Sequence, residues 1–396
     1  MALTLDAEKW RSKRGMKRLL RALGADEGLT RYVGGAVRDD LLGLPVSDID
    51  LATQIPPDEV VQRLQKARIK AVPTGIEHGT VTAVSDGQPV EITTLRRDVS
   101  TDGRRATVAF TDDWREDAAR RDFTINALSA DPLTGELFDY FNGLADLEQR
   151  HVRFIGDPLQ RIAEDHLRIL RFFRFHARFG AGAPDKAALE ACTARANDLM
   201  ALSRERIADE LLKLLALDDP SPTVAIMVDR GIFSPVLPEI GKEAPRNLAA
   251  LIACERAGGI APDPLRRFAA LLSRDPSVAE AVAARLRLSN KAKKRLICVA
   301  GGEFGPSPRA LAYWVGVDCA VDRLLLAGRV EDAAALASWH RPRMSIGGGA
   351  LIKRGLPEGP VVARTLRLIE ERWVAAGFPS GDDFERIVQE VLRSAR

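Results

Sequence analysis

The sequence predicts an α+β fold, in which a mixed head of strands and helices is followed by an all-helical remainder. Strand and helix signals alternate from residue 31 to about residue 140. From about Pro158 onward, helical periodicity dominates and strand signals almost vanish. A chain of 396 residues, 46% of them hydrophobic, is long enough for two or more domains with separate cores.

A glycine pair follows the first predicted strand of the head. Residues 31–33 have the pattern of a short strand, and residues 36–42 that of a helix ended by the next glycine. Between them, Gly34 and Gly35 permit backbone angles that side chains forbid and let a ligand approach the main chain closely. Arg38 in the first helical turn can add a two-pronged phosphate contact. This turn is therefore a candidate phosphate site, although a glycine pair alone is usually only a turn.

An Asp-Ile-Asp segment follows shortly afterwards. Residues 48–53 have the pattern of a strand, so Asp48 and Asp50 are predicted to point to the same face. Carboxylates together with substrate phosphates are the usual ligands of Mg²⁺. An isolated Asp-x-Asp is more often a solvated strand edge, but its position after the glycine turn favours nucleoside triphosphate chemistry. Neither a Walker loop nor a Rossmann fingerprint is present.

The next elements add a third acidic candidate. A lead-in helix is predicted over residues 1–24, and a helix over 57–67 after the strand. Residues 79–85 and 88–95 alternate as two strands, joined by the hairpin dipeptide Asp-Gly. Glu91 lies on the second of these strands, which could pair with the Asp48/Asp50 strand. Three carboxylates can hold one or two Mg²⁺ ions, whereas the pattern alone fits a solvent-facing Glu91 equally well.

Two basic segments complete the candidate site. Residues 104–113 are weakly patterned and predict a mobile loop, after which a helix is predicted from Trp114 through Leu128. This helix carries Arg120 and Arg121, which fit either a solvated face or a phosphate contact.

A second basic helix is predicted around Asp165 and Arg168, which are three apart and so neighbours on one helix. Arg171 and Arg174 continue the same spacing, and an apolar stripe is predicted at residues 163, 167, 170, 173 and 177. Such a helix fits a salt-bridged solvated face. It also fits a site where an aspartate accepts from an exocyclic amine and an arginine donates to a ring nitrogen or carbonyl.

Composition restricts the class of protein. The net charge of +3 is too small to decide on nucleic-acid binding. No apolar run of membrane-spanning length and no N-terminal apolar signal region are found, so no membrane partner is expected. No obligate protein partner is evident from the sequence. The four cysteines are widely spaced and are expected to be reduced and buried, which favours the cytoplasm.

Taken together, these motifs resemble class II tRNA nucleotidyltransferases, the CCA-adding enzymes, and their bacterial poly(A) polymerase relatives. The matching segments span roughly residues 30–240. They are Gly34-Gly35-Ala-Val-Arg38-Asp39, Asp48-Ile-Asp50, Gly75-Ile-Glu-His78-Gly79-Thr80-Val81, Val90-Glu91-Ile92-Thr93, Arg120-Arg121-Asp122-Phe-Thr-Ile-Asn126, Glu164-Asp165-His-Leu-Arg168-Ile-Leu-Arg171, Ser203-Arg-Glu205-Arg206-Ile207, Gly231-Ile-Phe and Leu237-Pro238-Glu239.

The resemblance implies a role for each candidate residue. It implies Mg²⁺ ligation by Asp48 and Asp50, with Glu91 as the third catalytic carboxylate. Contacts to CTP or ATP are implied for eight residues: Gly34, Gly35, Arg38, Arg121, Asp165, Arg168, Arg171 and Arg174. The base would be read by Asp165 and Arg168 without a nucleic-acid template.

The resemblance also implies a seahorse-like arrangement. Residues 1–150 would form the nucleotidyltransferase head, 151–215 a helical neck that recognises the base, and 216–396 a body and tail that bind tRNA. The implied reaction is addition of C, C and A to the tRNA 3′ end with release of pyrophosphate. The alternatives are poly(A) polymerase or an enzyme that adds only A or only CC. A silent RNA-binding module and a nucleotidyltransferase acting on a small molecule fit less well, because the carboxylates and the long helical remainder are both present.

Overall fold

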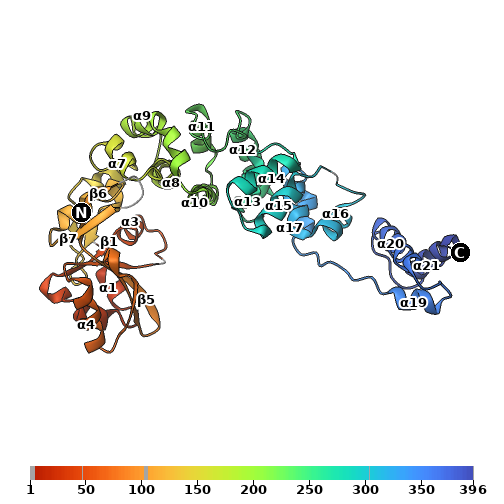
Figure 1. Ribbon diagram of the computed structural model, residues 1–396, viewed down its shortest axis with the longest axis horizontal. Helices are drawn as coiled ribbons and strands as arrows, with labels where there is room; N and C mark the ends of the chain where they lie inside the picture. Colours follow the sequence, from red (N-terminus) through yellow and green to blue (C-terminus); the bar gives the residue numbers. More distant parts are fainter. Residues whose placement is uncertain (1–4, 47, 102–105, 303, 396) are drawn as a thin grey trace. The chain divides into compact units, whose positions relative to one another are not determined.

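A computed structural model describes residues 5–46, 48–101, 106–302 and 304–395. The chain forms two compact units: unit 1 comprises Met1–Leu202 with Arg230–Pro235, and unit 2 comprises Ser203–Asp229 with Val236–Arg396. All strands of the described ranges belong to unit 1, in the red to orange part of Figure 1. The predicted α+β class is therefore confirmed. The three-domain division at residues 150 and 215 stays a prediction.

A seven-stranded mixed sheet forms the base of unit 1. Its strand order is β3-β4-β5-β2-β1-β8-β9, and only the β2–β5 pair is parallel. The strands are β1 (Thr30–Val33), β2 (Asp50–Thr53), β3 (Lys70–Gly75), β4 (Thr80–Ser85), β5 (Gln88–Thr94), β8 (Ser129–Ala130) and β9 (Leu137–Phe138). Helices α2 (Met16–Ala22) and α4 (Pro57–Lys66) pack against β4.

The predicted β4–β5 hairpin is confirmed, and buried and exposed side chains alternate along β5. Asp86 and Gly87 both have positive φ, +50° and +83°, as the tight hairpin turn of an Asp-Gly pair requires. Along β5, Val90 and Ile92 are buried and Glu91 is exposed. This alternation directs Glu91 away from the core face, on a strand that pairs with β2.

The prediction of one continuous lead-in helix over residues 1–24 is wrong. Its first four residues lie outside the described ranges, and the remainder forms α1 (Ala7–Arg11) and α2, separated by a turn. Gly15 ends this turn with φ +76°, and a Cβ placed on it would lie 2.5 Å from Ser85 Oγ. The chain therefore breaks at a left-handed glycine that touches β4, which helical periodicity does not reveal.

The predicted loop over residues 104–113 is also wrong where it is described. Residues 106–110 form β7 (Ala106–Phe110), which pairs antiparallel with β6 (Arg96–Thr101) in a separate two-stranded ribbon. Residues 102–105 lie outside the described ranges. The ribbon is held together by pairing between its two strands. Its sequence lacks the strict alternation of apolar and polar residues from which a strand is predicted.

The remaining helical elements of unit 1 are short and follow the sheet strands. They are η1 (Ala25–Glu27), α3 (Gly35–Leu41), η2 (Ile76–His78), α5 (Trp114–Ala119), η3 (Thr124–Asn126), α6 (Gly143–Glu148), α7 (Pro158–Glu164), α8 (Arg168–Phe179), α9 (Lys186–Ala194) and η4 (Ala196–Ala201). Helix α8 buries an aromatic row in which Phe172 and Phe175 pack with Phe123 and Phe154. Of the predicted apolar stripe, Ala163 is exposed, because it lies on α7 and not on α8.

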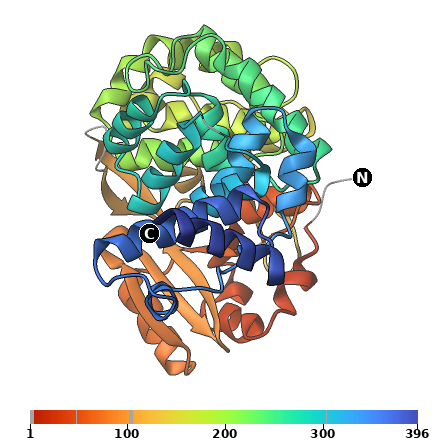
Figure 2. The ribbon, with the colours of Figure 1, turned by 90° about the vertical axis from the view of Figure 1, so that its right-hand side faces the viewer.

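Helices joined by loops are the regular secondary structure of the described part of unit 2. Its helices are α10 (Arg204–Leu215), α11 (Ser221–Asp229), α12 (Ala244–Ala257), α13 (Pro264–Ala270), α14 (Pro276–Arg285), α15 (Asn290–Ala300), α16 (Pro308–Val315), α17 (Val317–Leu326), α18 (Val330–Leu336), α19 (Gly348–Lys353), α20 (Pro360–Ala375) and α21 (Gly381–Ala395). Figure 2 shows α20 and α21 side by side, and their apolar faces join a core centred on Ile369 and Val388.

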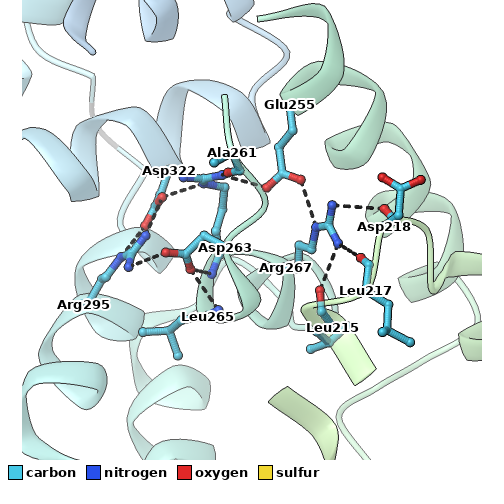
Figure 3. Close-up of polar contacts among 11 residues, drawn as sticks. Leu215, Leu217, Asp218, Glu255, Ala261, Asp263, Leu265, Arg267, Arg295 and Asp322 are labelled. Carbon is cyan, nitrogen blue, oxygen red and sulfur yellow. Dashed lines mark hydrogen bonds and ion pairs between the residues drawn. The ribbon is translucent and has the colours of Figure 1, made fainter. Parts of the chain in front are cut away.

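A buried charge network ties the centre of unit 2 together (Figure 3). Arg267 donates from Nε to Glu255 Oε2 at 2.9 Å and from Nη1 to the Leu215 carbonyl at 2.9 Å. Asp322 accepts from Arg266 Nε at 2.7 Å and from Arg295 Nε at 2.7 Å. These partners come from α10, α12, α13, α15 and α17, so the network fixes how five helices meet.

The prediction of four reduced cysteines is wrong for two of them. Cys298 on α15 and Cys319 on α17 form a disulfide, while Cys192 and Cys254 are free. The pair is 21 residues apart, and it is brought together by helix packing that no local spacing motif signals. Within the described ranges, every helix is too short or too polar to cross a bilayer.

Candidate active site

The glycine turn is confirmed between β1 and α3, and a side chain would not fit there. Gly34 has φ +72°, a backbone conformation that favours glycine. A Cβ on Gly34 would lie 2.9 Å from Arg121 Nη1, and one on Gly35 would lie 3.4 Å from Arg38 Nη2. The turn therefore brings bare main chain against two of the predicted phosphate-binding arginines.

Arg38 is buried and held in one orientation. Its Nε donates to Asp39 Oδ1 at 2.7 Å, and its Nη1 donates to Asn126 Oδ1. The guanidinium also stacks over the Phe179 ring at 4.1 Å. Burial lowers the pKa of Arg38 from its ordinary value, an effect that the charge of Asp39 opposes. A buried guanidinium with fixed donors is suited to recognise an anion.

Asp122 links this arginine to helix α8. Its Oδ2 accepts from Arg171 Nε at 2.7 Å, and its Oδ1 accepts from Asn126 Nδ2 at 2.9 Å and from the Phe123 backbone at 2.9 Å. Burial alone would raise the pKa of Asp122, but the charge of Arg171 and these hydrogen bonds hold it below its ordinary value. The result is a continuous chain of polar contacts from Arg38 through Asn126 and Asp122 to Arg171.

The predicted helix through Arg120 and Arg121 is wrong, because α5 ends at Ala119. Both arginines instead lie in the turn that follows and converge on buried Asp117. Arg120 Nε donates to its Oδ1 at 2.9 Å, and Arg121 Nη2 donates to its Oδ2 at 3.3 Å. Arg121 Nη1 also donates to the Asn126 carbonyl at 3.4 Å. The pair is thus anchored by protein carboxylate and carbonyl groups, and is not a solvated helical face.

The predicted continuous helix around Asp165 is also wrong. Helix α7 ends at Glu164, Asp165 is extended with φ −151°, and α8 begins at Arg168. Asp165 Oδ1 accepts from the Leu167 backbone at 3.1 Å. Arg168 donates to the Arg161 carbonyl at 3.0 Å and to the Arg120 carbonyl at 3.1 Å. Asp165 and Arg168 are therefore neighbours across a helix break, and not along one helical face.

These elements surround one cavity of about 460 Å³, a size suited to a small ligand. It is lined by Gly34, Gly35, Arg38, Arg120, Arg121, Asp122, Asn126, Asp165, Arg168, Arg171 and Phe175. Seven of the eight predicted nucleotide contacts are among them. Arg174 is not, and its guanidinium lies over the Phe175 ring at 4.7 Å. A cavity of about 470 Å³ in unit 2 has a mainly apolar lining that contains no carboxylate.

The predicted catalytic carboxylates lie at the sheet beside this cavity. Asp50 begins β2 and is the register partner of Glu91 on β5, while Val33, the residue before the glycine turn, pairs with Asp50 on the other side. The pairing of the two acidic strands is therefore confirmed. Asp48 precedes β2 instead of lying on it, so the predicted alternation along one strand does not apply to it.

The electrostatic environment of Asp50 fits a bound cation. Loss of hydration raises the pKa of Asp50, repulsion by Glu91 and Asp48 adds to the rise, and Arg121 opposes it. Adjacent carboxylates that repel one another are the hard oxygen donors that a divalent cation prefers. Among the described residues, however, no three acidic, histidine or cysteine side chains already converge on one point. The carboxylate oxygens of Asp50 and Glu91 have the chemistry that a divalent ion prefers. Metal binding by Asp48 and Asp50, with Glu91 as the third carboxylate, stays a prediction.

Four supporting residues were missed as site residues: Asp117, Asp122, Asn126 and Glu164. Glu164 Oε2 accepts from Arg161 Nη1 at 2.9 Å and from Arg168 Nη1. Two of them, Asp122 and Asn126, lie inside a motif that had been singled out for its arginines. The available signal is that Asp122 directly follows the arginine pair and Asn126 lies four residues further along. Because an isolated Asp or Asn looks like a solvated polar residue, sequence reasoning could not tell that both are buried between two arginines.

Asp122→Asn is expected to weaken the anchoring of Arg171 and to change acid stability. Since the folded pKa of Asp122 lies below its ordinary value, its stabilisation is present above about pH 4 and is lost as pH falls through the folded pKa. We therefore expect the variant to lose about 1–3 kcal/mol at pH 7 and to depend less on pH below 4. Tm measured from pH 7 to 3 checks this, with exposed Asp26→Asn as control. Equal pH profiles for wild type and Asp122→Asn would contradict it.

The chain matches two family models. The model described as "Poly A polymerase head domain" matches residues 30–153. The model described as "Probable RNA and SrmB- binding site of polymerase A" matches residues 183–243. The first covers the sheet and the glycine turn, and the second begins beyond α8.

Full-length relatives are also found. The chain is 34% identical over 390 residues to mitochondrial CCA tRNA nucleotidyltransferase 1 of Mus musculus, covering 92% of this chain and 87% of that protein. It is 30% identical over 375 residues to the CCA-adding enzyme of Latilactobacillus sakei, covering 88% and 90%. Among solved structures, the Bacillus stearothermophilus CCA-adding enzyme in complex with CTP gives a TM-score of 0.76 at 25% identity, with coverage of 96% and 98%.

Proposed function

Because the chain belongs to the class II CCA-adding family of tRNA nucleotidyltransferases, we propose that the cavity beside α3 and α8 binds the CTP or ATP used in its reaction. The enzyme adds C, C and A to the 3′ end of tRNA. The single observation that carries the pocket assignment is its lining, in which arginines from the glycine turn, the α5 turn and α8 surround one small-ligand cavity with Asp165.

The basic lining divides into two roles. Arg38 and Arg121 lie against the glycine turn, so we assign them to the triphosphate. Arg171, held by Asp122, supports the nucleotide in the same cavity. Their carboxylate and carbonyl partners fix them before a nucleotide arrives, which reduces the ordering cost of binding.

Asp165 and Arg168 are assigned to the base edge. Cytosine and adenine both present an exocyclic amino donor beside a ring-nitrogen acceptor, which matches an Asp acceptor beside an Arg donor. Guanine and uracil present the opposite order at that edge. Arg168 is held by two backbone carbonyls, so the pair can accept C or A and reject G and U without a template strand.

The catalytic carboxylates are assigned to metal binding. The family uses a divalent metal ion, and we propose Mg²⁺ held by Asp50 with Asp48, and Glu91 as the third carboxylate. The ion, when bound, would neutralise triphosphate charge and lower the pKa of the attacking 3′-hydroxyl. The residues themselves supply adjacent oxygen ligands beside the cavity that holds the nucleotide. Arg174 remains assigned to nucleotide support, as an outer residue of α8.

The tRNA-binding region and the cellular compartment are proposed from the same family. The helical unit 2 would bind tRNA, and the reaction is proposed to take place in the cytoplasm. Within the chemistry of the family, poly(A) addition and partial A or CC addition remain the alternatives to be tested. Relatives aligned over about nine-tenths of this chain are named CCA tRNA nucleotidyltransferase and CCA-adding enzyme, which favours complete CCA addition.

Asp165→Asn is expected to relax base selection without unfolding the protein. Asparagine keeps an oxygen that can accept from the Leu167 backbone, but it replaces a carboxylate oxygen with an N–H donor. We expect incorporation of CTP and ATP relative to UTP and GTP to fall by about 10–100-fold, as for the loss of one good base contact. Competition assays with pairs of nucleotides measure this ratio.

The matched control is Asp157→Asn. Asp157 caps α7 by accepting from the Leu159 backbone at 3.1 Å, as Asp165 accepts from Leu167, but it does not line the cavity. We expect its selectivity to equal that of the wild type. If both variants lose stability and neither changes selectivity, Asp165 is only a helix-capping residue.

A further inference from the structure

A second, smaller cavity of unit 1 is lined in part by Asp48. Its volume is about 120 Å³, and its lining includes Lys13, Arg14, Asp48, Ile49, Gln88 and Val90. In the sheet order β4-β5-β2-β1, the glycine turn follows β1, the carboxylates lie on or beside β2 and β5, and this cavity borders the β4–β5 hairpin. Of the three predicted catalytic carboxylates, only Asp48 lines this cavity, together with Lys13 and Arg14.

The turn that carries Lys13 and Arg14 is fixed against the sheet. Ser85 Oγ donates to the Gly15 carbonyl at 3.0 Å, and Arg18 Nη2 lies 2.9 Å from Asp86 Oδ1. The close approach of Gly15 to Ser85 leaves no room for a side chain. The two cations are thus presented by an anchored turn between α1 and α2, and not by a free chain terminus.

Lys13 and Arg14 differ from the other cations of this segment. Lys9 pairs with Asp40 at 2.7 Å, Arg18 pairs with Asp86, and Arg11 pairs with Glu8. Lys13 and Arg14 are exposed, and neither side chain has a hydrogen-bond or ion-pair partner within the described part of the chain. Two exposed cations of this kind beside an active-site carboxylate are suited to an anionic ligand.

We infer that Lys13 and Arg14 bind the phosphate backbone of the RNA primer next to its 3′ end. The inference rests on the proposed function, which requires two polyanions to meet at the carboxylates. The triphosphate is already matched by the arginines of the larger cavity beside β1. The second polyanion is the RNA end, which must approach the same carboxylates. Lys13 and Arg14 share a cavity with Asp48 and can meet it there.

The test compares the double variant Lys13→Ala/Arg14→Ala with Lys66→Ala/Lys70→Ala. The control removes the same two charges from exposed positions of the head that do not line the cavity. Binding of a tRNA that ends before CCA is followed by fluorescence anisotropy over a salt series. We expect Kd to rise about 3–10-fold for the first variant only. The slope of log K against log salt should fall by about 1.4, or 0.7 for each lost single-strand phosphate contact.

A chemical change in the RNA locates the contact. Replacing the 3′-terminal phosphodiester with a neutral methylphosphonate should weaken binding by the wild type. It should have little effect on the Lys13→Ala/Arg14→Ala variant, because the two changes remove the same interaction. At saturating tRNA we expect kcat within about twofold of wild type and an unchanged KM for CTP.

Three results would overturn the inference. One is a Kd and a salt slope equal to those of the control variant. Another is a raised KM for CTP with unchanged RNA affinity, which would assign the cations to the triphosphate. The third is a changed Mg²⁺ requirement with unchanged RNA affinity, which would assign them to Asp48. Since binding is measured without turnover, a wild type that binds tRNA but incorporates nothing would contradict the proposed function alone.

Discussion

Asp50→Asn is expected to lower nucleotide incorporation by at least about 10³-fold, the loss that corresponds to about 4 kcal/mol of transition-state stabilisation. The amide has no charge and one oxygen fewer, so it cannot complete the pair of carboxylates that Asp50 forms with Glu91. Single-turnover incorporation with tRNA ending in CC and with ATP measures the effect.

Folding and substrate binding should survive this change. The pKa of Asp50 is raised by lost hydration and by repulsion from Glu91 and Asp48, so a neutral side chain relieves an unfavourable charge. We expect Tm to be unchanged or slightly higher, and Kd for tRNA to stay within about twofold. Asp58→Asn, an exposed carboxylate at the start of α4, is the control and should keep full activity. Incorporation by Asp50→Asn above about a tenth of the wild-type rate would refute the metal role.

The Glu91→Gln variant tests whether Glu91 is a metal ligand or only a solvent-facing residue. If Glu91 acts together with Asp50, the variant should lose activity to a comparable extent, because the two residues are register partners. Exposed Glu77→Gln in η2 is the matched control. Near-normal activity in Glu91→Gln would reduce the catalytic set to the two aspartates.

Arg267→Met is expected to destabilise unit 2 by about 3–5 kcal/mol, the cost of removing one partner from a buried charge network. The Arg267 side chain is 1% exposed, and it donates to Glu255 and to the carbonyls of Leu215, Leu217 and Asp218. Methionine fills much of the volume but satisfies none of these acceptors, which remain buried.

Urea unfolding followed by tryptophan fluorescence measures this loss, since Trp314, Trp339 and Trp373 lie in unit 2. The control is Arg256→Met, whose side chain is 54% exposed and lies 3.0 Å from Asp218. We expect it to cost less than about 1 kcal/mol, as exposed ion pairs do. Equal losses in the two variants would contradict a special role for the buried network.

Local sequence signals predicted the framework of the site but not its supports. The Asp-Gly hairpin and the glycine turn depend on backbone conformations that few residues adopt, so their positions were correct. The strand patterns allowed the Glu91 strand to pair with the Asp50 strand without requiring it, and this pairing is observed. These features are encoded within a few residues of the chain.

Features that depend on distant contacts were predicted poorly. The helix break at Asp165 is stabilised by Arg168 donating to the Arg120 carbonyl, 48 residues away. The turn at Gly15 depends on contact with Ser85, and the disulfide depends on packing between α15 and α17. In each case the local pattern was compatible with a continuous helix or a free cysteine, and tertiary contacts decided otherwise.

The most direct measurement is incorporation by the purified protein with Mg²⁺ on three tRNA transcripts, which end before CCA, after C and after CC. Each is offered CTP, ATP or both, and products are resolved at single-nucleotide length. We expect the first transcript to gain C, C and A in that order and then to stop, and the other two to be completed to the same end. Long A tails, or arrest at one stage on every transcript, would contradict complete CCA addition.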